Sequence, residues 1–254
     1  MTSDYSIDLT GHRALVTGAG QHTGRAFAIA LAAAGAHVIV NDVVADKAEH
    51  VVTEIKAEGG QASAGVFDIT DLATVQSALE QDPVDIVINN VGGVREITFP
   101  IVNFGESDPT RWHRLVDLNL YASMNTAYAA LPHMREQGWG RFVTIISDAA
   151  RRAERGMAVY GAAKAASAAF MRGIATEYGI DGVTANAISF GSLAYDGSPE
   201  PDEDLLRRMT RNYAVKRRGT AADPVGLLLL LASDASSWIT GQVIPVNGGY
   251  TNAL

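Results

Sequence analysis

The chain of 254 residues contains no cysteine. Without thiols, a disulfide framework, a thiolate nucleophile and a Cys-ligated zinc site are all excluded, and nothing in the composition asks for an oxidising compartment. The opening residues, MTSDYSIDLT, also lack the basic region and apolar stretch of a secretory signal. These absences predict a cytoplasmic protein.

Long apolar runs and an excess of basic residues are absent as well. The longest strictly apolar tracts, such as residues 227–232, are far shorter than the ~18–20 residues that cross a bilayer. A formal charge of −8 argues against nucleic-acid binding, which needs a basic face for the phosphates. No H-E-x-x-H pair and no G-x-S-x-G elbow occurs, which argues against a histidine-built metal site and a serine hydrolase. We expect no membrane, nucleic-acid or metal partner.

Apolar residues are plentiful, at 47% hydrophobic against 19% charged, which is enough for a sizeable core. Runs rich in Val and Ile alternate with helical patterns, and several runs are continuous, as in strands that are covered on both faces. The pattern predicts one α/β domain over residues 1–254, a Rossmann-like doubly wound parallel sheet of about seven strands with helices on both faces. The expected strands are 14–17, 37–42, 63–68, 85–90, 141–147, 183–189 and 242–246, and the expected helices are 24–34, 46–58, 71–80, 109–137, 157–178 and 222–232.

The stretch 192–218 interrupts this alternation. It contains Gly197, Pro199 and Pro201, a cluster of acids, and then the basic, helix-like run LLRRMTRNYAVKRR. An excursion after a strand end of an α/β sheet is typical of a lid over the binding crevice. A solvated surface helix explains the same composition, so both interpretations stand.

A glycine-rich turn follows the first expected strand. In TGAGQHTGRAFAIALAAAG, Gly18, Gly20 and Gly24 lead into an amphipathic helix. Such a turn lets a pyrophosphate approach the backbone at a helix N-terminus, where free N–H groups and the helix dipole favour anions. Asp42 ends the second strand, where an acid hydrogen-bonds ribose hydroxyls and repels a 2′-phosphate. The pattern favours NAD over NADP, with a helix-capping Asp42 as the alternative.

Tyr160 and Lys164 are spaced i, i+4 and therefore share one face of an expected helix. A nearby ammonium stabilises a phenolate, which makes tyrosine a usable proton carrier at neutral pH. Ser147 ends the strand RFVTIIS, at the sheet edge where open α/β sheets bind their ligands. Each residue also has a structural alternative: Ser147 as a turn cap, Lys164 as a solvated lysine.

With these residues the sequence resembles the short-chain dehydrogenase/reductase family, over essentially the whole chain. The resemblance implies Tyr160 as general acid/base, Ser147 as hydrogen-bond partner of the substrate oxygen, Lys164 on the nicotinamide ribose and Asn119 in a water-mediated proton relay. A bond to its own helix backbone is the alternative for Asn119. The matching pieces are TGAG at 17–20 with Gly24, DITD at 68–71, NNVGG at 89–93, Asn119 in DLNL, Ser147, YGAAK at 160–164, NAIS at 186–189 and ITGQVIPVNGG at 239–249.

The resemblance also implies the cofactor contacts and the assembly. Two helices that contain residues 119–131 and 160–170 would build a dimer interface, within a homodimer or homotetramer. The implied chemistry is hydride transfer between a nicotinamide and a carbinol or carbonyl carbon. The implied cofactor contacts are Gly18, Gly20, Gln21, His22, Thr23, Gly24, Asp42, Asp68, Ile69, Asn90, Gly92, Tyr160, Lys164, Gly191 and Leu193.

The chain departs from the family pattern at a few positions. His22 stands where TGxxxGxG has its middle glycine, and its Cβ crowds the turn. We expect a modestly rearranged loop with His22 facing solvent, and a contact from the imidazole to phosphate as the alternative. The proline and threonine that often follow the sixth strand are replaced around Gly191 by Phe190 and Ser192. Asn247 stands where many relatives have Asp.

Basic residues gather near the expected site, because residues 151–218 hold 11 of the 20 Lys and Arg residues. A basic rim suits an anionic substrate, such as a carboxylate or a hydroxyacyl-CoA, and the segment around Tyr160 looks like that of relatives acting on such thioesters, alicyclic ones included. Solvated arginines are the alternative. The function predicted is an NAD(H)-dependent oxidoreductase that interconverts a secondary alcohol and a ketone. The competing hypothesis is a catalytically weak, nucleotide-binding regulatory or interaction protein, motivated by His22, Phe190 and Tyr195.

Overall fold

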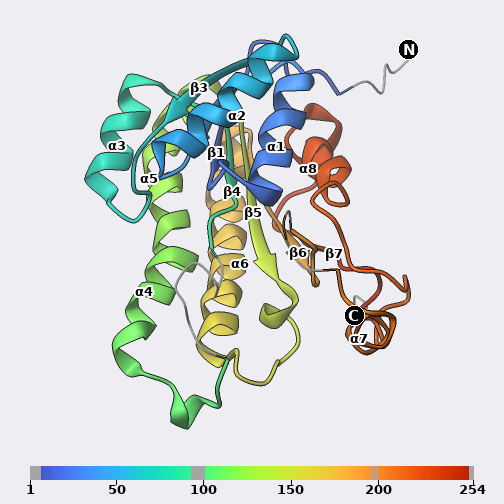
Figure 1. Cartoon of the computed structure of the whole chain (residues 1–254). Helices are drawn as coiled ribbons and strands as arrows, with labels where there is room; N and C mark the ends of the chain where they lie inside the picture. Colours follow the sequence, from blue (N-terminus) through green and yellow to red (C-terminus); the bar gives the residue numbers. More distant parts are fainter. Residues whose placement is uncertain (1–6, 93–100, 196, 198–199, 252–254) are drawn as a thin grey trace.

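Seven parallel strands form one sheet in the computed structural model, which describes residues 7–92, 101–195, 197 and 200–251 (Figure 1). The spatial order is β3-β2-β1-β4-β5-β6-β7, so the chain starts in the middle, runs outward to β3, and returns beside β1 to run the other way. The topological switch point therefore lies between β1 and β4, and such sheets bind ligands at the carboxyl ends of the strands at this point. The strands are β1 Arg13–Thr17, β2 His37–Asn41, β3 Gln61–Gly65, β4 Ile86–Asn89, β5 Gly140–Ser147, β6 Val183–Phe190 and β7 Val243–Val246.

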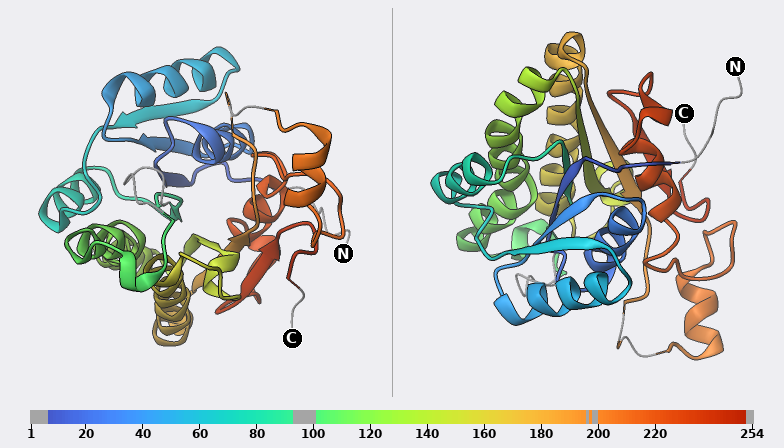
Figure 2. Two further views of the ribbon diagram at one scale, coloured as in Figure 1. Left: turned by 60° about the horizontal axis from the view of Figure 1, so that its bottom comes forward. Right: turned by 90° about the horizontal axis from the view of Figure 1, so that it is seen from above.

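Helices cover both faces of the sheet, and Figure 2 shows the layers from two further sides. Neighbouring residues of a strand face opposite layers: Val16 packs into the core under α1, α2 and α8, while Leu15 packs into the core under α3, α5 and α6. This explains the continuous apolar strands and confirms the predicted fold class. The longer helices are α1 His22–Ala33, α2 Ala45–Ala57, α3 Leu72–Gln81, α5 Ala122–Gln137, α6 Ala158–Tyr178 and α8 Val225–Leu231.

The structure corrects two of the expected elements. The single helix expected over 109–137 is a 3₁₀ turn, a short helix α4 Trp112–Val116, a π-helical turn Asp117–Tyr121 and then α5. The strand expected over 63–68 is β3 at Gln61–Gly65, because Asp68 closes a tight turn by accepting hydrogen bonds from the Thr70 amide and hydroxyl. Residues 66–68 are therefore not part of the strand.

The segment 192–218 lies at the edge where β6 and β7 end (Figure 1). Among its described residues, Glu203–Met209 are helical, as α7 capped by Asp202, so the helix-like expectation for the basic run beyond Met209 is wrong. Tyr213 is 7% exposed and its hydroxyl accepts the Ser192 amide, which ties the segment to the end of β6. The amino-acid composition of the segment gave no indication of this contact between Tyr213 and Ser192. Pro199, one of the residues on which the lid prediction rests, falls outside the described residues. Within the described ranges, no helix is long and apolar enough to cross a membrane.

Candidate active site

The glycine turn after β1 is fastened to the end of β4. The Thr17 hydroxyl oxygen accepts the amides of Asn90 (3.0 Å) and Val91 (3.1 Å), and the Asn90 side chain donates to the Thr17 carbonyl at 2.9 Å. Gly18 continues the turn with φ +60°, which favours glycine. The Asn90 amide group, predicted to contact the cofactor, thus holds the cofactor loop at the switch point.

The N-terminus of α1 lies directly on this turn. A Cβ on Gly24 would come within 2.3 Å of the Gly18 carbonyl oxygen, so only glycine permits this approach. No side chain caps the helix at Gln21, and its first turn, including Thr23, carries no acid. The first amides of α1 therefore keep their capacity to bind an anion, which fits the pyrophosphate of a dinucleotide.

Asp42 and Lys47 both border the turn at Gly20. A Cβ on Gly20 would lie 2.6 Å from the Asp42 Oδ2 and 2.6 Å from the Lys47 Cβ. The other Asp42 oxygen accepts the Val44 amide at 3.0 Å, so the carboxylate has one oxygen in a local turn and the other toward the loop. Lys47, which donates to Gln21 at 2.9 Å, was missed from the sequence. The available signal was a basic residue one turn into the helix that follows the acid.

His22 takes the backbone conformation of the glycine it replaces. Its φ is +51°, and among the described residues it is the only non-glycine with a positive φ. Its ring packs edge-on against Tyr195 with centroids 5.3 Å apart, and its Nδ1 is buried with no hydrogen-bond partner in the described part of the chain. The expectation of a solvent-facing ring is wrong, because the left-handed backbone turns the imidazole toward the start of segment 192–218.

Two predicted adenine-side residues lie in the turn after β3. Asp68 is exposed, but its carboxylate accepts two hydrogen bonds from Thr70. Ile69 is 4% exposed, packs into the core, and accepts the Asn125 side-chain amide on its carbonyl. The turn thus offers a ligand its backbone and the outer edge of one carboxylate.

Asn119, Lys164 and Gly92 converge behind the end of β4. A Cβ on Gly92 would lie 2.4 Å from the Asn119 Oδ1 and 2.6 Å from the Lys164 Nζ, so glycine is required there. Lys164 is 3% exposed and donates to the Ile145 carbonyl at 2.9 Å. The Asn119 Nδ2 donates to Leu115 at 2.9 Å, while its Oδ1 is buried with no partner among the described residues. An unsatisfied oxygen beside an ammonium suits a bound water or hydroxyl.

Ser147 and Tyr160 lie on two elements in close contact. Tyr160 is half-buried, one turn before Lys164 on α6. Ser147 ends β5, and its Oγ accepts the Ala149 amide at 3.2 Å within the 3₁₀ turn 148–150. A Cβ on Gly161 would lie 2.6 Å from the Ala149 carbonyl oxygen, so α6 rests against that turn. Ser147 does cap a turn, as the alternative held, yet its hydroxyl hydrogen remains a donor for a substrate oxygen.

The end of β6 is enclosed by two other segments. A Cβ on Gly191 would lie 2.9 Å from the Tyr213 hydroxyl and 3.2 Å from the Asn247 Cβ. Leu193 pairs with Gly219 in an isolated parallel bridge. Burial raises the pKa of Tyr213, so the phenol stays protonated while it accepts the Ser192 amide. Tyr213 supplies the anchoring that the missing proline and threonine left in doubt.

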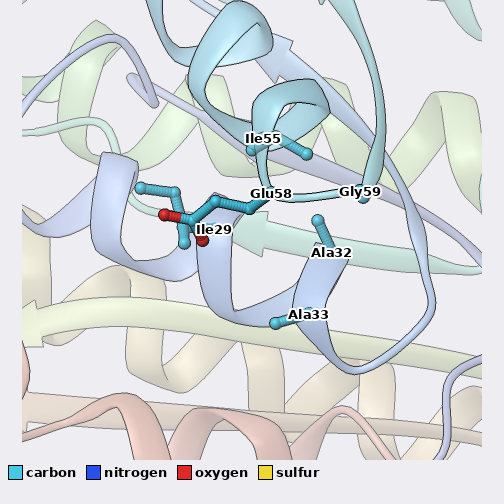
Figure 3. A pocket seen from close by; sticks show the side chains of 7 residues that line it. Ile29, Ala32, Ala33, Ile55, Glu58 and Gly59 are labelled. Carbon is cyan, nitrogen blue, oxygen red and sulfur yellow. The ribbon is translucent and has the colours of Figure 1, made fainter.

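A hollow between α1 and α2 lies apart from these residues (Figure 3). It encloses about 140 Å³ and has a single ionisable side chain, Glu58. None of the predicted site residues borders it, so it is not the catalytic centre. Within the described part of the molecule, no three His, Cys, Asp or Glu residues are placed to hold a metal ion. The hollow is lined by Ile29, Ala32, Ala33, Ile55, Glu58, Gly59 and Gly60.

Comparisons with known proteins agree with this geometry. Residues 18–251 match the family model described as "Enoyl-(Acyl carrier protein) reductase". The chain is 33% identical to 7alpha-hydroxysteroid dehydrogenase of Escherichia coli K12 over 262 residues, which cover 100% of both chains. It is 36% identical to cyclohexanol dehydrogenase of Rhodococcus sp. TK6, with 97% of this chain and 98% of that one covered.

Two solved structures superpose closely. One is 7α-hydroxysteroid dehydrogenase with NADH and 7-oxo glycochenodeoxycholic acid, at a TM-score of 0.89, 32% identity and 98% of each chain. The other is gluconate 5-dehydrogenase of Burkholderia cenocepacia with NADP and tartrate, at a TM-score of 0.90, 29% identity and 98% of each chain.

The chain belongs to the short-chain dehydrogenase/reductase family. It is an oxidoreductase that acts on CH–OH groups of small molecules with a nicotinamide dinucleotide, and this membership does not favour the catalytically weak alternative.

Proposed function

We propose that this enzyme interconverts a secondary alcohol and a ketone, with Tyr160 as general acid/base. The observation that carries the proposal is the buried Lys164 and the unsatisfied Asn119 Oδ1, which meet at Gly92 one turn from Tyr160. The nicotinamide supplies or takes the hydride when it is bound. Tyr160 gives or takes the hydroxyl proton, and Ser147 orients the substrate oxygen by donating its hydroxyl hydrogen.

Lys164 and Asn119 support that proton transfer. The buried ammonium of Lys164 stabilises negative charge on a phenolate one turn away. The Asn119 oxygen beside it is placed to accept from a water, which would pass the proton onward. Asn119 lies in the π-helical turn 117–121, and its carbonyl accepts the Ser167 hydroxyl of α6, which holds the two helical segments together.

We propose NAD as the preferred cofactor over NADP. Asp42 presents one carboxylate oxygen to Gly20, where a 2′-phosphate would be repelled. Lys47 at the same glycine weakens that repulsion, and the similar solved structures contain NADH in one case and NADP in the other. The cofactor contacts proposed are the turn from Gly18 to Gly24, Asp42, and the residues at the ends of β3, β4 and β6 named above.

We propose an anionic substrate held beneath a lid formed by 192–218. Arg151 is engaged with Thr251 (2.8 Å) and Asp148 (3.5 Å), and Arg155 donates to the Asn103 Oδ1 at 3.0 Å. Arg152 is exposed on the loop between Ser147 and Tyr160, and its guanidinium contacts only an aromatic ring among the interactions described, that of Tyr250. The tartrate and the 7-oxo glycochenodeoxycholic acid in the two similar solved structures carry carboxylates. A carboxylate is therefore the charge we expect at Arg152, with hydroxyacyl-CoA and alicyclic alcohols as further candidates. The expected cytoplasmic location stays a prediction.

Turnover by a Tyr160→Phe variant tests the proposal. Cyclohexanol and gluconate serve as first substrates for the wild-type enzyme, with NAD in excess. We expect kcat to fall by about 10²–10⁴-fold, since the ring remains and only the proton carrier is lost. NADH binding, followed by fluorescence, should remain within about twofold as evidence of an intact fold. Unchanged turnover in Tyr160→Phe would refute Tyr160 as the proton carrier.

Fluorescence titrations of the wild type with NADH and NADPH test the cofactor preference. We expect NADH to bind at least about tenfold more tightly, a difference of ~1.4 kcal/mol. Asp42→Asn should narrow the gap by strengthening NADPH binding, and Lys47→Met should widen it. Equal affinities in the wild type would overturn the preference for NAD.

A further inference from the structure

A buried carboxylate lies directly behind the catalytic serine, and the mechanism above does not use it. Asp148 follows Ser147 in the chain, is 1% exposed, and has no contact with solvent that could stabilise its charge. Burying a carboxylate costs free energy unless several donors satisfy it. Its partners therefore indicate what the charge is for.

The three donors come from two distant parts of the chain, β6 and the segment that follows β7. Asp148 accepts hydrogen bonds from Ser189 Oγ (2.9 Å) on β6, Asn247 Nδ2 (2.8 Å) and Thr251 Oγ1 (3.1 Å). Arg151 Nη1, at 3.5 Å, is the neighbouring positive charge. One side chain thus joins the turn after β5, the end of β6 and the segment that follows β7.

The segment that follows β7, residues 247–251, forms a strap between the catalytic loop and the lid. On the lid side, the Val215 amide donates to the Gly248 carbonyl at 2.9 Å, and Tyr250 stacks on Tyr213 with centroids 5.0 Å apart. On the loop side, the Arg152 guanidinium lies over the Tyr250 ring, 5.1 Å from its centroid. A displacement of the strap would therefore move both the lid and the proposed carboxylate-binding arginine.

We propose that Asp148 is a positioning residue, which sets the lid and Arg152 over the substrate by fastening the strap 247–251 to the turn behind Ser147. The proposal rests on the proposed function. Asn247 completes the arrangement, because an amide donates to the carboxylate where the Asp common in relatives would repel it. The pair Asp148–Asn247 is therefore complementary, and the same bond can be rebuilt with the two residues exchanged.

Steady-state kinetics of Asp148→Asn in the full-length enzyme test the proposal, with whichever of cyclohexanol or gluconate the wild type oxidises. We expect kcat/KM to fall by about 10–100-fold, mostly through a higher KM, as for a misplacement of about 1 Å. NADH affinity should stay within about twofold of the wild-type value, because the pyrophosphate turn is held by β1 and β4 and makes no described contact with Asp148. Asn247→Asp alone should show a similar loss. The exchanged double variant, Asp148→Asn with Asn247→Asp, should recover to within about threefold of the wild type.

Two further variants allow the proposal to be tested even if Asp148→Asn folds poorly. Ser189→Ala and Thr251→Val each remove one of the donors, and each should raise KM by about two- to tenfold. Wild-type KM in both, or a double variant no better than its single parents, would overturn the proposal. A purely structural role would instead lower the melting temperature in every variant while KM remained constant.

Limited trypsin digestion separates this proposal from the proposed function, because it needs no turnover. Arg207, Arg208 and Arg211 are exposed on the lid. Asp148→Asn should speed cleavage at these sites by at least about threefold, because a loosened lid opens locally more often and exposes them to the protease. The exchanged double variant should restore the wild-type cleavage rate. Equal cleavage rates would count against the strap even if the wild type proves active, whereas an inactive wild type with faster cleavage in the variant would refute only the reaction.

Discussion

A single residue, His22, carries the most unusual backbone of the pyrophosphate turn. A left-handed conformation costs a non-glycine residue roughly 1–2 kcal/mol, so the protein retains this imidazole at the expense of stability. The ring contacts Tyr195 at the start of the lid. The side chain therefore links the turn after β1 to the start of segment 192–218.

Replacing His22 separates backbone strain from the ring contact. His22→Gly and His22→Ala both lose the contact with Tyr195, but only glycine relieves the strain. We expect the glycine variant to be more stable than the alanine variant by about 1 kcal/mol, measured as the free energy of unfolding in urea. An alanine variant as stable as the glycine variant would mean that the positive φ carries no cost.

Residues that act through short sequence spacings could be predicted, and residues that act across the fold could not. Tyr160 and Lys164 share a helix face at i, i+4, so their proximity follows from sequence alone. Lys47 reaches Gln21 from 26 positions away, and Asp148 reaches Asn247 from 99 positions away. No periodicity encodes such pairs, because they depend on the order of the strands in the finished sheet.

At the scale of elements, the contact between α6 and the 3₁₀ turn after β5 sets the geometry of the catalytic groups. Tyr160 lies in the first turn of α6 and Ser147 precedes the 3₁₀ turn, and the two elements touch at Gly161. Gly173, on the same helix, has nothing within 4 Å of the position of its Cβ. The two glycines form a matched pair, of which one is required by packing and the other is not.

Substituting alanine for each of these two glycines should change the free energy of unfolding in opposite directions. Gly161→Ala drives a methyl group against a carbonyl oxygen and should cost about 1–3 kcal/mol of unfolding free energy, with a fall in kcat. Gly173→Ala should raise stability by about 0.5–1 kcal/mol and leave kcat unchanged. Urea denaturation and steady-state kinetics check both. A fully active Gly161→Ala variant would show that the spacing of α6 and the turn is not critical.

An ion pair lies at the C-terminal end of the proposed lid. Both terminal guanidinium nitrogens of Arg217, Nη1 and Nη2, donate to the Asp223 carboxylate, at 2.7 and 2.6 Å, and the Thr220 amide donates to it as well. The hydrogen bonds from Arg217 hold the pKa of Asp223 well below its usual range. A lowered carboxyl pKa stabilises the fold above the unfolded value, near ~3.9, and that stabilisation is lost as the pH falls.

Asp223→Asn should therefore lower the melting temperature at pH 7 but not in acid. The pair is solvent-accessible, so we expect a difference of no more than roughly 2–4 °C. The difference should shrink as the pH falls below ~4, where the unfolded carboxyl binds a proton. Thermal denaturation across pH 3–7, with the exposed pair Arg207–Glu203 as a control through Glu203→Gln, gives the comparison. A difference that stays constant over that range would contradict the sign of the shift.

Elements were predictable where the hydrophobic pattern was strong. The buried strands β1, β4, β5 and β6 were located to within one or two residues, because both of their faces are apolar. The edge strand β3, with Ser63 and Gln61 in its pattern, was misplaced. The π-helical turn at Asn119 leaves no trace in the periodicity, since one extra residue in a turn resembles ordinary variation.

At the scale of the whole molecule, the doubly wound parallel sheet followed from the alternation of strands and helices. The oligomeric state could not be inferred from that alternation. Tyr121 is 50% exposed and Tyr128 is 63% exposed, on the helical segment implied as a dimer interface. Aromatic residues that are exposed on a single chain are typical of surfaces that another chain covers in an assembly.

Sedimentation velocity should show a species heavier than the 26.8 kDa chain. Tyr128→Glu introduces a charge on the implied interface and should shift the distribution toward the monomer by at least about tenfold in the dissociation constant. Glu49→Lys, on the exposed side of α2 across the sheet, is the control and should leave the distribution unchanged. A wild type that sediments as a monomer at micromolar concentration would refute the interface.

The two ends of the lid meet at the bridge between Leu193 and Gly219. A loop whose entry and exit are adjacent can change length or sequence without altering the distance that the rest of the fold must span, and its closure entropy grows only slowly with length. The segment between them can therefore vary in length without moving the strands around it. A segment exchanged from a relative would still have to reproduce the contacts that Tyr195, Tyr213 and Val215 make with the rest of the fold.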